Sequence, residues 1–120
     1  MKTYGPYEAK RESGNLVFIS GQVGVDPNSG SVASDIETQT RQTLENLQTA
    51  LDGIPLKNVV KTTVYLKDMK DFIVVNSIYV EYFDQGPRPA RACVAVADLP
   101  DIGNHPLLIE IEAIAFKGEN

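Results

Sequence analysis

Two parts of the sequence repeat apolar residues at the spacing of an amphipathic helix. Before the first part, residues 36–51, Ser34 and Glu37 have the spacing of a capping box, and Gly53 follows the last turn. The pattern predicts a helix with Ser34 as its N-cap that ends before Gly53. Its buried face is expected to carry Ile36, Thr40, Leu44, Leu47 and Leu51.

The second helical pattern covers residues 72–84. Asp68 and Asp71 precede it as a candidate N-terminal cap, and residues 85–89 end it with one glycine and two prolines. An aromatic stripe at this spacing is more typical of a buried core than of a ligand site, so we expect it to face a sheet. The stripe consists of Phe72, Val75, Tyr79, Tyr82 and Phe83.

Five other stretches have the composition or the alternation of strands. The first two are separated by Ser13 and Gly14, which predicts a β-hairpin, and a loop rich in turn-forming residues follows at 26–30. About three strand-like segments precede the first helix, and the later order is strand, helix, strand, strand. Since both helices are amphipathic, each is expected to cover the same side of one sheet. The stretches are residues 7–12, 16–20, 59–66, 89–96 and 107–116.

The second face of this sheet has no predicted helix to cover it. The residues expected there are too apolar for free contact with water, which favours burial against another copy of the chain. The sequence therefore predicts a homo-oligomer. The residues expected on this face are Cys93, Ala95, Ala97, Leu108, Ile114 and Phe116.

A single arginine interrupts the apolar run at residues 89–96. In a strand, Arg91 and Cys93 lie on one face, and Ala92 and Val94 lie on the other. A guanidinium is costly to bury unless an anion pairs with it, and its planar shape suits a carboxylate. This pattern favours a small ligand that carries a carboxylate.

The last predicted strand, residues 107–116, alternates with a period of two residues. Ile109 and Ile111 share one face, and Glu110 and Glu112 share the other. Two successive carboxylates on a partly apolar face indicate either an exposed sheet surface or the wall of a site.

Composition limits the class of protein and of partner. The chain has 120 residues, which suits one domain over residues 1–120, and its net charge of −5 disfavours a nucleic-acid surface. Its single cysteine excludes an internal disulfide and a CxxC metal site. The N-terminus lacks a signal peptide, and no apolar run is long enough to cross a membrane, so we expect a cytoplasmic protein or one of the mitochondrial matrix.

Several of these stretches are also motifs of a known protein family. Over nearly its whole length the chain resembles the RidA/YjgF family of reactive intermediate deaminases, also called L-PSP endoribonucleases. The most specific matches are Pro-Ala-Arg-Ala-Cys-Val at 89–94 and Ile-Glu-Ile-Glu-Ala-Ile-Ala at 109–115. The other matches, in the same order as in the family, are Gly-Pro-Tyr at 5–7, Ile-Ser-Gly-Gln at 19–22, residues 59–69, and residues 75–83.

The resemblance implies a chorismate-mutase-like α/β (α+β) fold, with a mixed six-stranded sheet and two helices on one face. It also implies a homotrimer with active sites in the clefts between subunits. Members of the family hydrolyse 2-enamine and 2-imine intermediates, such as 2-aminoacrylate and 2-iminopropanoate, to 2-keto acids and ammonia without a cofactor. The implied enzyme is a 2-iminobutanoate/2-iminopropanoate deaminase.

The resemblance also assigns roles to residues of this chain. Arg91 is expected to bind the carboxylate of the substrate, with help from the backbone around Cys93. Glu110 is expected to position or activate the attacking water, and Tyr7 and Ser20 to line the pocket. This chemistry suits the residues, because an imine carbon is already electrophilic and hydrolysis needs a positioned water and a proton carrier rather than a metal.

Departures from the family pattern lie around the expected pocket and bear on substrate range. Residues 100–108 form a longer loop than is usual before the last strand, and residues 83–89 form a shorter segment. Ala95 stands where many members have a glutamate, and Glu8 replaces a small residue beside Tyr7.

Structural interpretations remain open for individual residues. Arg91 is alternatively a structural residue paired with Glu110 or Glu112 across strands. Cys93 is more typical of a buried small apolar residue than of a nucleophile, and His105, in the longer loop, is expected to be exposed.

Two other functions are compatible with the sequence. One is an endoribonuclease or translation inhibitor, which the acidic composition disfavours. The other is a non-catalytic trimer that binds a small carboxylate as a regulator or chaperone.

Overall fold

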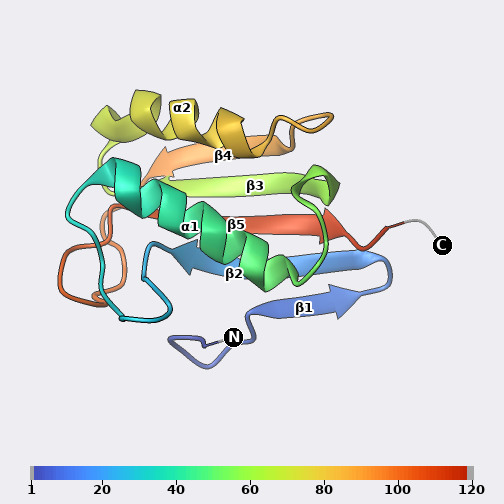
Figure 1. Cartoon of the computed structure of the whole chain (residues 1–120), viewed down its shortest axis with the longest axis horizontal. Helices are drawn as coiled ribbons and strands as arrows, with labels where there is room; N and C mark the ends of the chain where they lie inside the picture. The colour runs from blue at the N-terminus through green and yellow to red at the C-terminus, as the bar shows by residue number, and fades with distance from the viewer. Residues whose placement is uncertain (1, 119–120) are drawn as a thin grey trace.

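Five strands form one sheet, and both helices pack on the same side of it (Figure 1). The computed structural model describes residues 2–118; the terminal residues that the single-domain expectation also includes lie outside this range. In chain order the elements are β1 (Lys10–Ser13), β2 (Leu16–Val23), α1 (Ile36–Leu51), the 3-10 helix η1 (Leu56–Asn58), β3 (Val59–Leu66), the 3-10 helix η2 (Met69–Asp71), α2 (Phe72–Tyr82), β4 (Ala90–Ala95) and β5 (Ile109–Phe116).

The sheet is mixed, with the strand order β1-β2-β5-β3-β4. Neighbouring strands are antiparallel except β3 and β4, which are parallel and connected through α2, as a parallel pair requires a crossover. The expectation of six strands is wrong for the described residues. After β2, Val25 and Val32 form only an isolated bridge across the turn, because the turn-forming residues between them leave no extended segment to pair.

Helix α1 begins at Ile36 with Asp35 as its N-cap, so the prediction of Ser34 is wrong by one residue. Asp35 Oδ2 accepts hydrogen bonds from the backbone N–H and the hydroxyl of Thr38, both at 2.8 Å. A carboxylate at the N-cap also has the favourable sign for the positive end of the helix dipole. At the other end Asp52 and Gly53 adopt positive φ angles and terminate the helix.

The main hydrophobic core lies between the helices and the sheet. The predicted alternation of the last strand is confirmed: Ile109 and Ile111 are fully buried under the helices, whereas Glu110 and Glu112 are only partly buried on the opposite side. Burying a side chain of this size contributes about 1.5–3 kcal/mol, which fixes the face that β5 turns to the helices. Core residues from the other elements include Val17, Leu44, Leu47, Leu51, Val64, Leu66, Val75 and Ile78.

We call the side of the sheet away from the helices the open face. It carries Glu110, Glu112 and several apolar side chains, of which Leu16 and Phe18 are each 40% exposed and Val94 is 44% exposed. Cys93 does not belong there as expected, nor does Ala95, because they are register partners of Val64 and Leu66, which face the helices.

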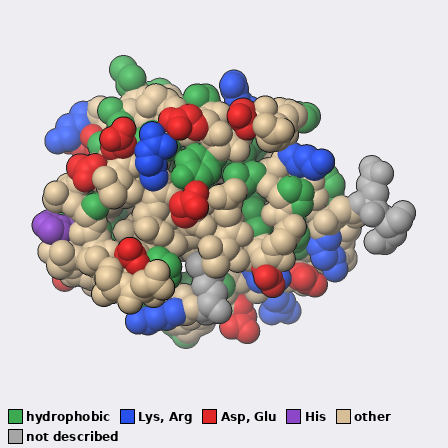
Figure 2. All heavy atoms as spheres, in the orientation of Figure 1, with side chains coloured by type: hydrophobic (Ala, Val, Ile, Leu, Met, Phe, Trp, Pro, Cys, Tyr) green, Lys and Arg blue, Asp and Glu red, His purple; other side chains and the backbone are tan. Residues whose placement is uncertain are grey.

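On the helical side, acidic and basic side chains are interspersed around small apolar areas (Figure 2). Arg41 connects the two helices there through two hydrogen bonds to Glu81, both of 3.2 Å. Neither helix within residues 2–118 is long and apolar enough to span a membrane.

Candidate active site

Glu110, near the start of β5, is held against a bulge in β2. The register between β2 and β5 shifts between Ile19 and Gln22, which leaves Ser20 and Gly21 as the irregular residues. The bulge brings Gly21 so close to Glu110 that a Cβ atom at Gly21 would collide with the carboxylate. A glycine is therefore required for the observed position of the Glu110 side chain.

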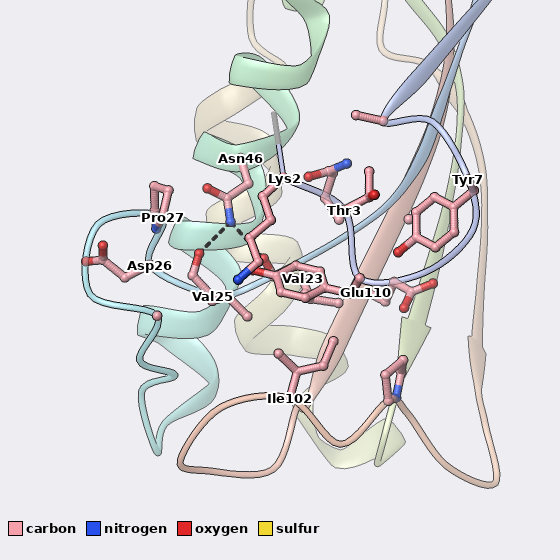
Figure 3. Close-up of a pocket in the computed structure, with 16 residues that line it drawn as sticks. Lys2, Thr3, Tyr7, Val23, Val25, Asp26, Pro27, Asn46, Ile102 and Glu110 are labelled. Atoms are coloured by element: carbon pink, nitrogen blue, oxygen red, sulfur yellow. Dashed lines mark hydrogen bonds between the residues drawn. The ribbon is translucent and has the colours of Figure 1, made fainter.

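Glu110 and Tyr7 both line a cavity of about 120 Å³ (Figure 3). The N-terminal segment forms one wall with residues 2–4 and Tyr7, the end of β2 forms another, and the long loop before β5 contributes Pro100 and Ile102. Segments from both ends of the chain thus meet around one carboxylate, and Tyr7 and Glu110 line the same cavity.

Ser20 lies beside this cavity but supports it indirectly. Its hydroxyl donates a 2.6 Å hydrogen bond to the Glu8 carbonyl, and its backbone N–H donates one of 3.0 Å to the Ala9 carbonyl. These bonds fix the segment that carries Tyr7. Ser20 is not among the residues that line the cavity.

The carboxyl of Glu110 has an elevated pKa. Partial burial raises the pKa of Glu110 because it disfavours the charged form, and the nearby charge of Glu112 raises it further. Glu112 itself accepts a 2.6 Å hydrogen bond from the Tyr65 hydroxyl, and this bond is the first cause of the raised pKa of Tyr65. Glu110 is therefore protonated more readily than an ordinary exposed glutamate.

Arg91, on β4, lies on the helical side of the sheet. Its guanidinium carbon is 4.8 Å from the ring centre of Tyr79 and 5.7 Å from that of Phe72, which is within the range of cation–π attraction. Among residues 2–118 its guanidinium has no ion-pair partner and donates no hydrogen bond. The aromatic rings hold the cation and leave its donors available for an anion.

Cys93 lies two residues further along the same face of β4 and packs against the core. Burial raises the pKa of its thiol, and the opposing effect of the Arg91 charge is the smaller of the two. A thiol with a raised pKa is a poor nucleophile at neutral pH. The interpretation of Cys93 as a small apolar residue fits this environment.

Arg91 and Glu110 lie on opposite faces of the sheet within one chain. Arg91 is the register partner of the buried Thr62, whereas Glu110 is the partner of Tyr65 on the open face. The alternative of an Arg91 ion pair with Glu110 or Glu112 across strands is therefore wrong for this chain. The structure shows two separate groups, Tyr7 with Glu110 and Arg91 with Cys93.

The comparisons with known proteins identify the family of the chain. The family described as Endoribonuclease L-PSP matches residues 1–117 of the chain. The chain belongs to this family, which is the RidA/YjgF family. Its structure and its sequence motifs are thus those of one family over almost the whole length.

Individual relatives are similar along the full chain. A RutC family protein of Pyrococcus horikoshii is 48% identical over 119 residues, which cover 97% of this chain and 90% of that protein. The Salmonella typhimurium protein named 2-iminobutanoate/2-iminopropanoate deaminase is 44% identical over 117 residues, covering 94% of this chain and 88% of that protein. The structure of Escherichia coli TdcF with bound serine matches with a TM-score of 0.89 at 37% identity, over 97% of this chain and 91% of that one.

Some features around the candidate site are not predicted from the sequence. The strand expected at residues 16–20 ends before Gly21, although a Ser-Gly pair inside a strand-like stretch is a bulge signal. Tyr79 is buried in the core as expected, but Phe72 is exposed, and both rings lie near Arg91. His105 is exposed as expected, with Nδ1 2.9 Å from the Val32 carbonyl oxygen. Within residues 2–118 no group of three or more His, Cys, Asp or Glu side chains is arranged for a metal.

Proposed function

We propose that this chain is a hydrolytic deaminase that converts 2-enamine and 2-imine acids, such as 2-aminoacrylate and 2-iminopropanoate, to 2-keto acids and ammonia. The observation that carries the proposal is the pair of Arg91, a guanidinium without a protein partner, and Glu110, a carboxyl of raised pKa beside a cavity. The Salmonella relative named as such a deaminase and the serine bound to TdcF, a small molecule with a carboxylate, support it.

The proposed active site lies between two copies of the chain in a homotrimer. Arg91 and Glu110 cannot meet within one chain, because the sheet separates them. However, β4 is an edge strand, so Arg91 lies at a margin that a second copy can approach with its open face. The exposed Leu16, Phe18 and Val94 favour burial of that face, and a ring of identical contacts closes the assembly.

In this site Arg91 binds the substrate carboxylate through two parallel hydrogen bonds, supported by the backbone around Cys93. Glu110 takes a proton from a water molecule as the water oxygen attacks the carbon of the protonated imine, which gives a neutral carbinolamine. Glu110 then returns this proton to the carbinolamine nitrogen, and the C–N bond breaks. Ammonia leaves as the carbinolamine hydroxyl gives its proton to the Glu110 carboxylate and becomes the carbonyl of the keto acid. The raised pKa of Glu110 suits both roles, since a carboxyl nearer to neutral pH both accepts and returns a proton.

The reaction so written needs neither a metal nor an organic cofactor. The cytoplasm or the mitochondrial matrix remains the predicted compartment. Tyr7 shares the cavity with Glu110 and is placed to contact the substrate. Ser20 acts by holding the segment next to Tyr7.

A coupled assay tests the proposal. A pyridoxal-phosphate-dependent serine or threonine dehydratase generates the imine, and keto-acid release is followed with and without this protein. The wild type is expected to accelerate the release, and Arg91→Ala to lower the acceleration by about 100-fold or more, because a charged carboxylate contact is lost. Arg41→Ala, which changes an arginine of α1 on the helical surface that forms only exposed ion pairs with Glu37 and Glu81, is the matched control and should keep the wild-type activity.

Two results would contradict the proposal, and each adds a second measurement to the coupled assay. A wild-type protein that cannot be distinguished from buffer, yet binds 2-oxobutanoate in an Arg91-dependent manner, would indicate a non-catalytic carboxylate-binding regulator or chaperone. Cleavage of single-stranded RNA that persists through further purification and weakens with salt would support the endoribonuclease of the family's description. The net charge of −5 argues against the second outcome.

A further inference from the structure

The long loop before β5 reaches back to the carboxylate of the proposed site. Pro100 and Ile102 of this loop line the same cavity as Glu110, and the Ile102 side chain points from the loop into it (Figure 3). We propose that this cavity receives the side chain of the substrate and that Ile102 determines the size of the side chain accepted. The inference rests on the proposed deaminase function and adds a prediction of which substrates the enzyme prefers.

The loop that carries Ile102 is fixed to the rest of the fold. Gln39 of α1, which is fully buried, donates a 2.9 Å hydrogen bond to the Pro106 carbonyl and accepts one of 2.8 Å from the Leu108 N–H. Asn104 Oδ1 accepts a 2.7 Å hydrogen bond from the Val32 N–H. A wall held at these points can select by size, because it does not move away from a larger ligand.

Two of the polar groups that line the cavity, Asn46 and Asp26, are already bonded within the protein. Asn46 donates to the carbonyls of Val23 and Val25 at 2.8 and 2.9 Å and accepts from Gln42 at 2.9 Å. The Asp26 carboxylate accepts from two backbone N–H groups of its own turn.

Since these two groups need no ligand, the apolar part of the lining remains for one. It is formed by Tyr4, Val23, Val25, Pro27 and Ile102. Lys2 also lines the cavity; it is exposed, and its ammonium lies 5.4 Å from the ring centre of Tyr4. The apolar part of the cavity therefore fits an aliphatic side chain.

The volume sets the size of that side chain. A cavity of about 120 Å³ is somewhat smaller than a cavity of about 150 Å³ that takes up benzene, a ring of six carbons. A four-carbon side chain such as that of leucine therefore has room in it, whereas a methyl group leaves most of it empty. Because the cavity borders Glu110, such a side chain lies next to the carbon that water attacks.

The test compares two substrates on the same preparation of each variant. An L-amino-acid oxidase, with oxygen and catalase, generates the imino acids of alanine and leucine, and their hydrolysis is followed by competition with semicarbazide trapping. The readout is the ratio of kcat/KM for the leucine-derived imine to that for the alanine-derived imine. A fraction of unfolded protein cancels in this ratio.

Ile102→Phe, which fills the cavity, is expected to lower the ratio about 10-fold or more, the discrimination typical of a pocket that has lost room for one or two carbons. Ile102→Met, of similar volume, should keep the wild-type ratio. Leu99→Ala is the matched control, because Leu99 packs in the same loop but does not line the cavity, and it should also keep the ratio.

The two hypotheses fail in distinguishable ways. A wild type that hydrolyses neither imine overturns the proposed function itself. A wild type that hydrolyses the alanine-derived imine, with the same ratio in the wild type and in a folded Ile102→Phe, overturns the assignment of Ile102. A change in ratio for Leu99→Ala as large as that for Ile102→Phe also overturns it, because the effect would then belong to the loop as a whole.

Discussion

The surroundings of Arg91 and of Glu110 differ in how they are built. Arg91 lies on an edge strand over the rings of Phe72 and Tyr79, and all three residues come from the connected segment α2–β4. Glu110 lies against a bulge of β2 and a cavity formed by the N-terminal segment, β2 and the loop before β5. The surroundings of Arg91 thus come from one continuous segment of the chain, whereas those of Glu110 come from segments that lie far apart in the sequence.

The difference extends to electrostatics. Aromatic rings stabilise the Arg91 cation without neutralising it, so its charge remains available to an anionic ligand. Around Glu110, burial and the neighbouring Glu112 disfavour the charged form. One region is suited to holding a charge and the other to exchanging a proton, and neither is a complete site without the other.

The strongest test of this comparison mixes two inactive variants. Arg91→Ala and Glu110→Gln are each expected to lose activity by about 100-fold or more, since binding and proton transfer fail respectively. Subunits refolded together should regain about one quarter of the wild-type activity, because a shared site then receives an intact arginine and an intact glutamate by random pairing. Assembled variants that are mixed without refolding are the control and should stay inactive. Mixed oligomers that remain inactive would show that the two residues do not share a site.

A second test addresses only the Glu110 side. Gly21→Ala places a Cβ against the Glu110 carboxylate, and the displaced carboxyl is expected to lower kcat/KM by about 10- to 100-fold. Gly14→Ala is the control: Gly14 has a positive φ of 59° and no neighbour near its missing Cβ, so it should cost stability of about 1 kcal/mol without loss of activity. Equal activities of the two variants would contradict the role given to the bulge.

A third test compares a tyrosine on each side of the sheet by urea unfolding at one protein concentration. Tyr79→Phe removes the 2.7 Å hydrogen bond to the fully buried Thr62 and should lower the free energy of unfolding by about 1–3 kcal/mol, because the threonine hydroxyl keeps no partner. Tyr65→Phe removes the bond to Glu112, which water can replace, and should cost less than about 1 kcal/mol. The reverse order would mean that the open face is as dry as the core.

The smallest expected effect is the pH dependence of stability due to Glu110. Its pKa is raised in the folded protein, so the folded state binds this proton more tightly than the unfolded chain does. The free energy of unfolding therefore falls as the pH rises from the ordinary glutamate pKa through the raised value. Glu110→Gln lacks this loss and is expected to gain stability over the wild type, by less than about 1 kcal/mol, at pH 8 but not at pH 4.

Thermal unfolding of both proteins across this pH range measures the effect. Asp101→Asn, which changes an exposed carboxyl of the loop, is the control and should follow the wild type at every pH. A Glu110→Gln curve parallel to that of the wild type would show that the carboxyl is not desolvated.

Much of the local structure could be predicted from short patterns. The alternation of Ile109 and Ile111 with Glu110 and Glu112 was confirmed, because burying one face of a strand fixes the direction of every second side chain. The helix beginning was wrong by one residue, since Ser34 and Asp35 are both good caps and only their backbone geometry decides between them. The sixth strand, which the resemblance implied, was wrong for the described residues, because Val25 and Val32 form only an isolated bridge across a turn.

The sequence by itself determined that Arg91 and Glu110 each stand out from an apolar strand, and its motifs determined the family. It did not determine on which face of the shared sheet each residue lies. That depends on the register of β4 against β3 and of β3 against β5, and a shift of one residue in a register exchanges the two faces. The tertiary structure decided that the face shared by Arg91 and Cys93 lies under the helices and that Ile102 lines the cavity of Glu110. Both facts depend on contacts between segments far apart in the chain, which local patterns do not encode.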